Sequence, residues 1–462
     1  MEAPGSNNTA AGNYYDVGNF TISNGVTVAA GDSDAVTVGA FAQGYSYSGV
    51  NNGVLSYTGP TDKAVISFAA GTEITATDVA IAMSGTFTNN GTILGHVQEG
   101  SGYGIELDGS LNGSLVNSSS GLIGLDFVNT PITAGSASGT WAAISVGGDV
   151  GATGTLTNNG TIRVDVAESA FRTETGSSPS ANDASGSFYG IYVSGAVAGT
   201  VTNAGSISVD VDRATGVSAA GIYSDSVSQG GAITNSGAIN VNLAPRSLDS
   251  WGTVIGAGIH VDDVVNGIVT NTATGSISVK ITPNPSYGSS LSTLGSGSTV
   301  SAIGIYAGSV GVTGSIVNNG SIDLEINSHW GYYLGETGGG IVVSGNVEGS
   351  VVNNGSIDFT VTGEGLTQAS WYAYGIFVDR IAVGGSVTNS SSGTINVAMT
   401  ASASASNSVA GILVYSGNSG TLTNAGTITV TAHEEVPTPI DTGAGMSTAL
   451  PGSILAYGIH IS

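Results

Sequence analysis

The stretch that decides the fold is Gly190-Ile191-Tyr192-Val193, together with Val201-Thr202-Asn203-Ala204-Gly205-Ser206-Ile207. In both blocks apolar and polar residues alternate, which is typical of a β-strand with one buried face. The Asn-x-Gly triplet predicts a corner, because it supplies a residue that tolerates a positive φ. The two blocks alternate along the chain, so the sequence is an internal repeat. Copies of the corner asparagine stand at Asn89, Asn117, Asn158, Asn203, Asn235, Asn271, Asn318, Asn353, Asn389 and Asn424.

The spacing of the copies separates a constant half of each repeat from a variable half. Successive corner asparagines lie between 28 residues (Asn89 to Asn117) and 47 residues (Asn271 to Asn318) apart. The distance from the glycine of a Gly-Ile block forward to the corner glycine is 15 to 18 residues. The distance from the corner glycine to the glycine of the next Gly-Ile block varies more, from 13 to 32 residues. The constant half predicts a scaffold, and the variable half predicts surface loops.

These features predict an all-β fold, a single-stranded parallel β-helix (β-solenoid) of about ten to twelve coils with variable surface loops. At a rung spacing of about 4.8 Å this is a rod on the order of 50–60 Å long. A β-propeller is the rival architecture. Its blades hold four strands each, which fits two short constant strands and arcs of unequal length less well.

The repeat divides the chain into two regions. Residues 1–80 match the repeat weakly and are expected to form degenerate capping coils, of which residues 1–26 could serve as a donor segment for a neighbouring copy. Residues 81–462 form the repetitive solenoid, which ends in a half repeat. Ile459 and Ile461 in that half repeat are therefore predicted to lie at an interface.

Composition excludes several classes of protein. Glycine accounts for 74 of 462 residues, charged residues for 8%, and the formal net charge is −25. Only seven residues are Lys or Arg, too few for a nucleic-acid footprint or for binding to an anionic membrane surface. No apolar run approaches the roughly 18 residues of a spanning helix, so direct membrane insertion is not expected.

The repeats Val201-Thr202-Asn203-Ala204-Gly205-Ser206-Ile207 and Gly190-Ile191-Tyr192-Val193 resemble the passenger regions of bacterial autotransporters and related large surface repeat proteins. The resemblance covers roughly residues 80–462. It implies export to the outer surface of a Gram-negative cell and supplies no catalytic residues. The translocator barrel of that family has no counterpart in this sequence, so we expect it to have been removed or the chain to be retained at the surface differently.

Stacked corner asparagines could form an amide ladder along the rod, with each side chain hydrogen-bonded to the next. The alternative is that asparagine merely tolerates the turn. The predicted ladder residues are Asn158, Asn203, Asn235, Asn318, Asn353 and Asn424.

The residue after Gly-Ile is predicted to point outward, because it lies between two inward apolar residues. That column is unusually apolar for a surface. Either the variable arcs fold over it, or it is a lateral contact surface for a neighbouring rod or a receptor. It contains Tyr192, Tyr223, His260, Tyr306, Val342, Phe377, Leu413 and His460.

Two aromatic clusters lie in variable arcs, Trp330 with Tyr332 and Trp371 with Tyr372. Aromatic faces bind sugar rings and anchor interfaces. They also attach loops to a scaffold, and the sequence leaves both interpretations open.

Charged residues offer candidates for calcium but none for catalysis. Asp262 with Asp263, and Asp323 with Glu325, could supply oxygen ligands, although a solvated acidic face is the simpler interpretation. The clusters 163–165 and 210–213 combine acids with an arginine, and we expect cross-strand charge pairs there. No catalytic residue and no resident cofactor are predicted.

The sequence therefore predicts a non-enzymatic extracellular structural protein that stacks head to tail into a homopolymer, a filament or surface matrix, and serves adhesion. A second hypothesis is a monomeric stalk whose arcs bind glycans or other cells. A third is a polysaccharide-active β-helix enzyme, which would need acids and a base on one face.

Overall fold

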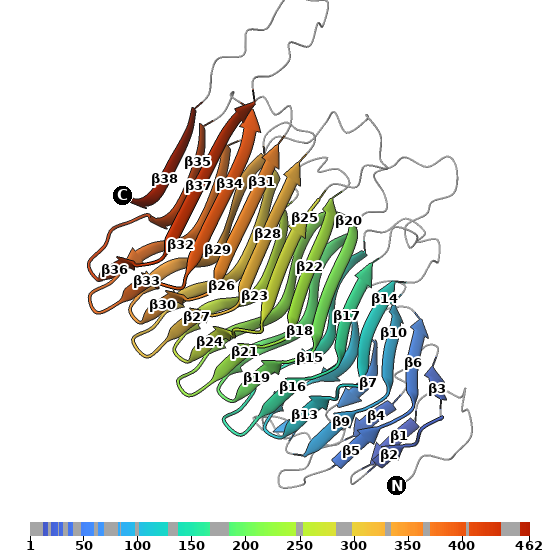
Figure 1. Ribbon diagram of the computed structural model, residues 1–462. Helices are drawn as coiled ribbons and strands as arrows, with labels where there is room; N and C mark the ends of the chain where they lie inside the picture. Colours follow the sequence, from blue (N-terminus) through green and yellow to red (C-terminus); the bar gives the residue numbers. More distant parts are fainter. Residues whose placement is uncertain are drawn as a thin grey trace, which may run out of the picture.

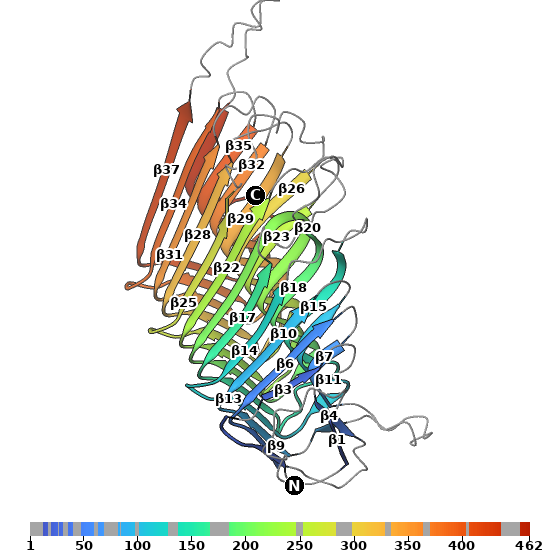
Figure 2. The same ribbon diagram turned by 90° about the vertical axis from the view of Figure 1, so that its right-hand side faces the viewer.

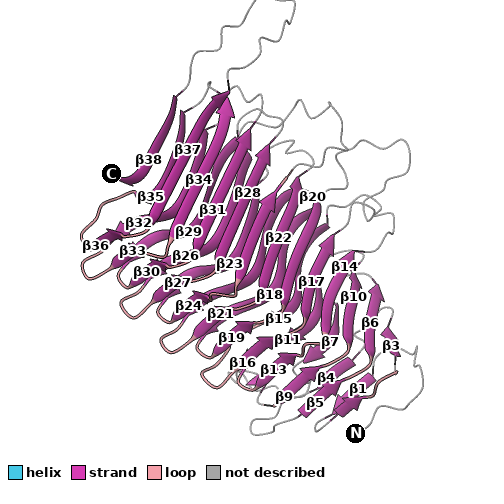
Figure 3. Ribbon diagram, in the orientation of Figure 1, coloured by secondary structure: helices cyan, strands magenta, loops and turns pink. Residues whose placement is uncertain are grey.

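The computed structural model describes residues 85–97, 101–127, 137–166, 184–245, 253–282, 298–328, 334–363, 370–402, 406–435 and 453–462. Before residue 84 it describes 13–16, 20–25, 27–30, 36–39, 48–59, 63–68 and 82–83. Every element in these ranges is a β-strand (Figure 3). All pairings between strands are parallel, and they connect one coil to the next, which confirms the predicted β-solenoid (Figure 1).

Each coil contributes strands to three stacks. The Asn stack holds short strands that end at the corner asparagine. Neighbours in this stack pair in register without a shift, and their outward and inward residues alternate. Its strands are β2 (Phe20–Ile22), β5 (Ser48–Asn51), β9 (Thr86–Asn89), β13 (Ser114–Asn117), β16 (Thr155–Asn158), β19 (Thr200–Asn203), β21 (Ala232–Asn235), β24 (Ile268–Asn271), β27 (Ser315–Asn318), β30 (Ser350–Asn353), β33 (Ser386–Asn389) and β36 (Thr421–Asn424).

The Ile stack follows the asparagine corner. In its strands the isoleucine of the repeat is the second residue, and inward aliphatic residues alternate with outward polar ones. They are β3 (Thr27–Ala30), β6 (Val54–Gly59), β10 (Thr92–Val97), β14 (Leu122–Phe127), β17 (Thr161–Val166), β20 (Ser206–Val227), β22 (Ala238–Pro245), β25 (Ser276–Ile281), β28 (Ser321–Ser328), β31 (Ser356–Gly363), β34 (Thr394–Ser402) and β37 (Thr427–Glu435).

The Gly stack carries the Gly-Ile block, and β20 runs through both this stack and the Ile stack. A two-residue pair, β8 (Ala82–Met83) with β12 (Ser110–Leu111), lies beside it. The first and last strands, β1 and β38, lie at opposite ends of the rod (Figures 1 and 2). The Gly stack consists of β1 (Asn13–Asp16), β4 (Val36–Gly39), β7 (Lys63–Phe68), β11 (Gly102–Leu107), β15 (Ala137–Val146), β18 (Ala184–Val197), β20, β23 (Thr253–Val265), β26 (Ser298–Val310), β29 (Leu334–Val347), β32 (Ser370–Ile381), β35 (Ser406–Val414) and β38 (Ser453–Ile461).

The core is built of columns of identical or similar side chains. Ile162 pairs in register with Ile207, and Ile207 with Ile239, and all three are fully buried. The Gly stack repeats the arrangement with Ile191 and Ile222. Aliphatic side chains of one coil therefore lie directly over those of the next, and one continuous cluster fills the rod.

The corner asparagines form an amide ladder. Within the described chain the Nδ2 of each donates to the Oδ1 of the next over 2.7 to 2.9 Å, from Asn51 through to Asn424. Nδ2 also donates to a backbone carbonyl of the next coil, as Asn158 does to the Ser206 oxygen at 3.1 Å. The ladder stops at the first coil, because Ile22, and not Asn24, occupies its register position.

The role expected for the corner glycine needs a correction. Among the described residues the glycines with positive φ include Gly230 and Gly384 but no glycine of an Asn-x-Gly corner. The reason for glycine there is close packing between coils, since a Cβ on Gly205 would overlap the carbonyl oxygen of Gly160. The corner therefore needs the small size of glycine more than its conformational freedom.

Candidate contact surface on the Gly stack

The residues after Gly-Ile form the outward column that the sequence predicts. Tyr192 pairs with Tyr223, Tyr223 with His260, and His260 with Tyr306, one per coil. The column continues through Val342, Phe377 and Leu413 to His460. Most of these side chains are half-buried, although they do not face the central core.

The Gly-Ile pair bends the strand and brings a second column against the first. Gly190 and Ile191 are consecutive and both face inward, since a Cβ on Gly190 would overlap the Ile207 side chain. The residues that flank this pair, Tyr189 and Tyr192, both face outward, and their ring centroids are only 5.0 Å apart. The bend recurs between Tyr374 and Phe377, at 5.5 Å, and at the last described coil.

Sequence reasoning missed this second column. Its members stand three residues before the first column, and two of them, Ala220 and Ala257, are almost completely covered by the rings beside them. The signal that could have revealed it is the repeated pattern aromatic-Gly-Ile-aromatic, as in Tyr189 to Tyr192 and 374–377.

The aromatic rings stack along the rod. Centroid distances are 5.1 Å between Tyr192 and Tyr223, 5.2 Å between Tyr223 and His260, and 4.5 Å between His260 and Tyr306, with interplanar angles of 19 to 25°. Tyr223 and His260 therefore have a ring on each face. These two rings therefore offer no free face on which a sugar could lie.

Burial sets the protonation of this surface. It raises the pKa of the Tyr223 hydroxyl well above its ordinary value, and the negative charge of Asp262 adds to the effect. Burial also raises the pKa of Tyr374 to about 12. His260 moves the other way, because burial lowers its pKa, although the Asp262 carboxylate at 3.4 Å from Nε2 opposes that shift. Tyr223, Tyr374 and His260 are therefore neutral near pH 7.

The sequence predicts Trp371 in a variable arc, either as a binding residue or as an attachment of the arc to the scaffold, and its burial rules out the binding role. Trp371 belongs to β32 and is 1% exposed within the central core. Gly363 in the same coil makes room for it, since a Cβ there would overlap the indole ring. Its neighbour Tyr372 faces outward and is exposed. Trp330 and Tyr332 lie outside the described residues.

The acidic candidates are in part occupied by cations of the chain itself. Asp323 and Glu325 both face Lys280 of the preceding coil, at 3.8 and 3.3 Å. Asp262 contacts His260, and Asp263 beside it is exposed. Within the described part of the chain, no three histidine, cysteine or acidic side chains come together as a metal site would require.

The predicted charge pair at 163–165 connects neighbouring coils. The Arg163 guanidinium donates to the Asp126 carboxylate at 2.6 Å. Asp165 is half-buried beside them, and burial raises its pKa, with the charges of Asp126 and Asp210 adding to the shift. Asp210 accepts hydrogen bonds from Ser208 and Asn242 at 2.5 Å. The side chain of Arg213 is not described.

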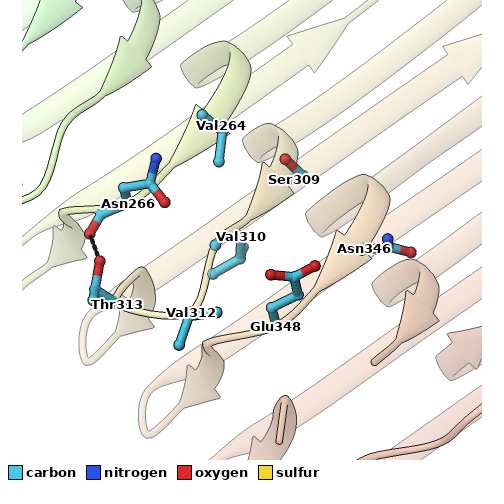
Figure 4. A pocket seen from close by; sticks show the side chains of 9 residues that line it. Val264, Asn266, Ser309, Val310, Val312, Thr313, Asn346 and Glu348 are labelled. Atoms are coloured by element: carbon cyan, nitrogen blue, oxygen red, sulfur yellow. Dashed lines mark hydrogen bonds between the residues drawn. The ribbon is translucent and has the colours of Figure 1, made fainter. Parts of the chain in front are cut away.

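A shallow depression of about 410 Å³ lies between the turns of neighbouring coils (Figure 4). Its polar lining includes Asn266, Asn346 and Glu348, and its apolar lining includes Val264 and Val312. Thr313 Oγ1 donates to the carbonyl of Asn266 at 2.7 Å and connects the turns of the two neighbouring coils. The single carboxylate and the open shape make this a gap between turns and not a ligand pocket.

The last described coil leaves apolar side chains uncovered. Ile459 is 42% exposed and Ile461 is 50% exposed, whereas their register partners Ile412 and Val414 are fully buried.

In comparisons with known proteins, no protein-family model, no curated protein and no solved structure matches the chain. Among the residues that the structure describes, no helix has the length and apolar character needed to cross a membrane.

Proposed function

We propose that the protein is a non-catalytic structural rod on the outer surface of a Gram-negative cell, where it serves adhesion. The observation that carries the proposal is the continuity of the stacking. The amide ladder runs from Asn51 to Asn424, the strands of the Asn stack pair without a register shift, and one continuous aliphatic cluster lies beside them. Such a scaffold holds its two ends at a constant distance and presents a long lateral surface.

The position of the variable segments supports a role in contact. After residue 85, the segments that differ most in length, such as 167–183, 246–252 and 283–297, stand in the sequence between the end of an Ile-stack strand and the start of a Gly-stack strand. One corner of the solenoid therefore carries the sequence variety of the chain, and loops placed by a rigid scaffold commonly carry recognition.

Head-to-tail stacking of copies is the second part of the proposal. A coil from another copy, laid in register on β36, β37 and β38, would bury Ile459 and Ile461 and continue the backbone ladder. In such a junction β2 of the incoming copy would lie on β36 and its β1 would give up its place in the Gly stack to β38, so that Ile22 would follow Asn424 in the ladder position.

The junction gives a specific test of stacking. Ile22→Asn would extend the amide ladder across the junction, so we expect longer polymers by light scattering, while Ile22→Ala, the matched control, should shorten them. This part of the proposal would be contradicted if both substitutions changed the polymer length equally. It would also be contradicted if the natural protein formed no polymers.

Surface exposure is tested on cells that carry the natural gene. Antibodies against the rod should label intact cells, and deletion of the gene should reduce attachment. Labelling that appears only after the cells are permeabilised would refute the proposed location.

Three of the candidate aromatic residues do not favour the glycan-binding alternative. The faces of Tyr223 and His260 are covered by neighbouring rings, and Trp371 is in the core.

A further inference from the structure

The outer face of the Asn stack differs from every other side of the rod. Each four-residue strand from β9 to β36 directs two side chains outward. None of the twenty side chains is charged, all are alanine, serine or β-branched residues, and eleven of them are threonine. We call this the threonine face. It consists of Thr86, Thr88, Ser114, Val116, Thr155, Thr157, Thr200, Thr202, Ala232, Thr234, Ile268, Thr270, Ser315, Val317, Ser350, Val352, Ser386, Thr388, Thr421 and Thr423.

The threonine face carries no charge, although the protein has a formal net charge of −25. The outward columns of the Ile stack include Asp126, Asp165 and Asp210, and the aromatic column is flanked by Asp225 and Asp262. Two copies approaching through those sides would bring like charges together, which costs affinity. The threonine face is the side on which the close approach of two copies involves the least repulsion.

The face is also regular enough to pair with itself. Its strands lie in one continuous row with no register shift from β9 to β36 (Figure 1). Columns of β-branched side chains at one fixed spacing can interdigitate with an identical array, as they do between paired sheets. The outward threonine and serine hydroxyls can also bond across such a contact.

The area of the face reaches what a specific interface needs. Ten strands at about 4.8 Å, each of four residues at about 3.3 Å, cover about 600 Å² per copy and about 1,200 Å² in a pair. That is the lower end of the standard size for a stable interface.

We propose that two copies of this chain pair side by side through their threonine faces. The pair buries the neutral side of each rod and leaves the acidic Ile stack and the variable corner exposed. The contact is lateral, so it does not depend on the head-to-tail stacking proposed above. Stacking changes the length of an assembly, whereas pairing changes its width.

The experiment places charges at the centre of the face. Thr234 and Thr270 are register partners on β21 and β24, the two middle strands. Purified natural protein should sediment at twice 45.2 kDa or multiples of it, and images should show paired rods. In the double variant Thr234→Asp/Thr270→Asp, repulsion across the contact should weaken pairing by at least about tenfold.

Two further proteins make the result specific. Thr234→Lys/Thr270→Lys should not pair alone but should pair when mixed with the aspartate variant, because the charges then attract. Thr360→Asp/Thr429→Asp adds the same charge at exposed positions of the Ile stack and should pair like the natural protein. Thermal unfolding should confirm that all variants are folded. Natural protein that stays single at every concentration, an aspartate variant that still pairs, or a mixture that does not pair would overturn the proposal.

Discussion

At the scale of single residues, the amide ladder explains why asparagine recurs at the corner. Asn235 is fully buried, accepts from Asn203 at 2.8 Å and donates to Asn271 at 2.8 Å. A buried amide without partners would cost stability, and stacking at one rung per coil satisfies each with the next. The ladder thus makes the polar corner compatible with a dry core, and it fixes the register between coils.

Replacing one ladder member should be costly. Asn235→Leu keeps the size of the side chain but removes the donor to Asn271 and the acceptor for Asn203, which leaves buried polar atoms unpaired. We expect a loss of about 3 kcal/mol in unfolding free energy, measured by urea denaturation. Thr234→Ala in the same strand faces outward and should change it by less than about 0.5 kcal/mol. Equal effects of the two changes would contradict the ladder.

Asp165 makes stability depend on pH. Because burial raises its pKa in the folded state, the stability contributed by the protonated form is complete below the ordinary value of 3.8 and is lost as the pH rises through the raised pKa. Asp165→Asn should therefore be more stable than the natural protein at pH 7, and the difference should vanish below pH 3.8 in urea titrations. The control Asp323→Asn removes a carboxylate that faces Lys280 and should not stabilise. If the Asp165→Asn variant were less stable than the natural protein at pH 7, the pKa of Asp165 would not be raised in the folded state.

At the scale of elements, the strands of the scaffold were predictable and the bend in the Gly stack was not. Alternation identified inward residues such as Ile207 and Val209, because a half-buried strand imposes a period of two. Gly190 and Ile191 break that period by facing inward together, so the convergence of Tyr189 and Tyr192 could not be deduced from alternation. Trp371 was misplaced for a related reason: β32 extends into the arc that insertions had suggested was a loop.

The bend glycine should tolerate no side chain where a coil covers it. Gly221→Ala would place a methyl group against Ile239 and the backbone of Gly258, so we expect about 1–3 kcal/mol of destabilisation in urea unfolding. Gly458→Ala is the matched control when single, unstacked chains are measured, because it has the same place in the repeat and its added methyl group would meet no atom of its own chain within 4 Å. If both changes were harmless, the bend would not depend on close packing.

At the scale of the whole molecule, repetition accounts for both the rod and its surfaces. Each outward position becomes a column, so one side accumulates rings, another acids and the third threonines. The stacked architecture could be predicted because spacing and corner residues are local properties of the sequence. The separation of rings, acids and threonines onto different sides of the rod was harder to predict. It requires knowing which outward positions of different strands share a face.

Distances along the threonine face test the stacking itself most directly. The chain has no cysteine, so introduced pairs can be spin-labelled uniquely and measured in protein diluted with unlabelled copies. With one label at Thr157, partners at Val317, Val352, Thr388 and Thr423 lie four, five, six and seven rungs away. We predict distances of about 19, 24, 29 and 34 Å, rising by about 4.8 Å per coil. A series that levels off or falls, as in a closed ring of repeats, would contradict the account.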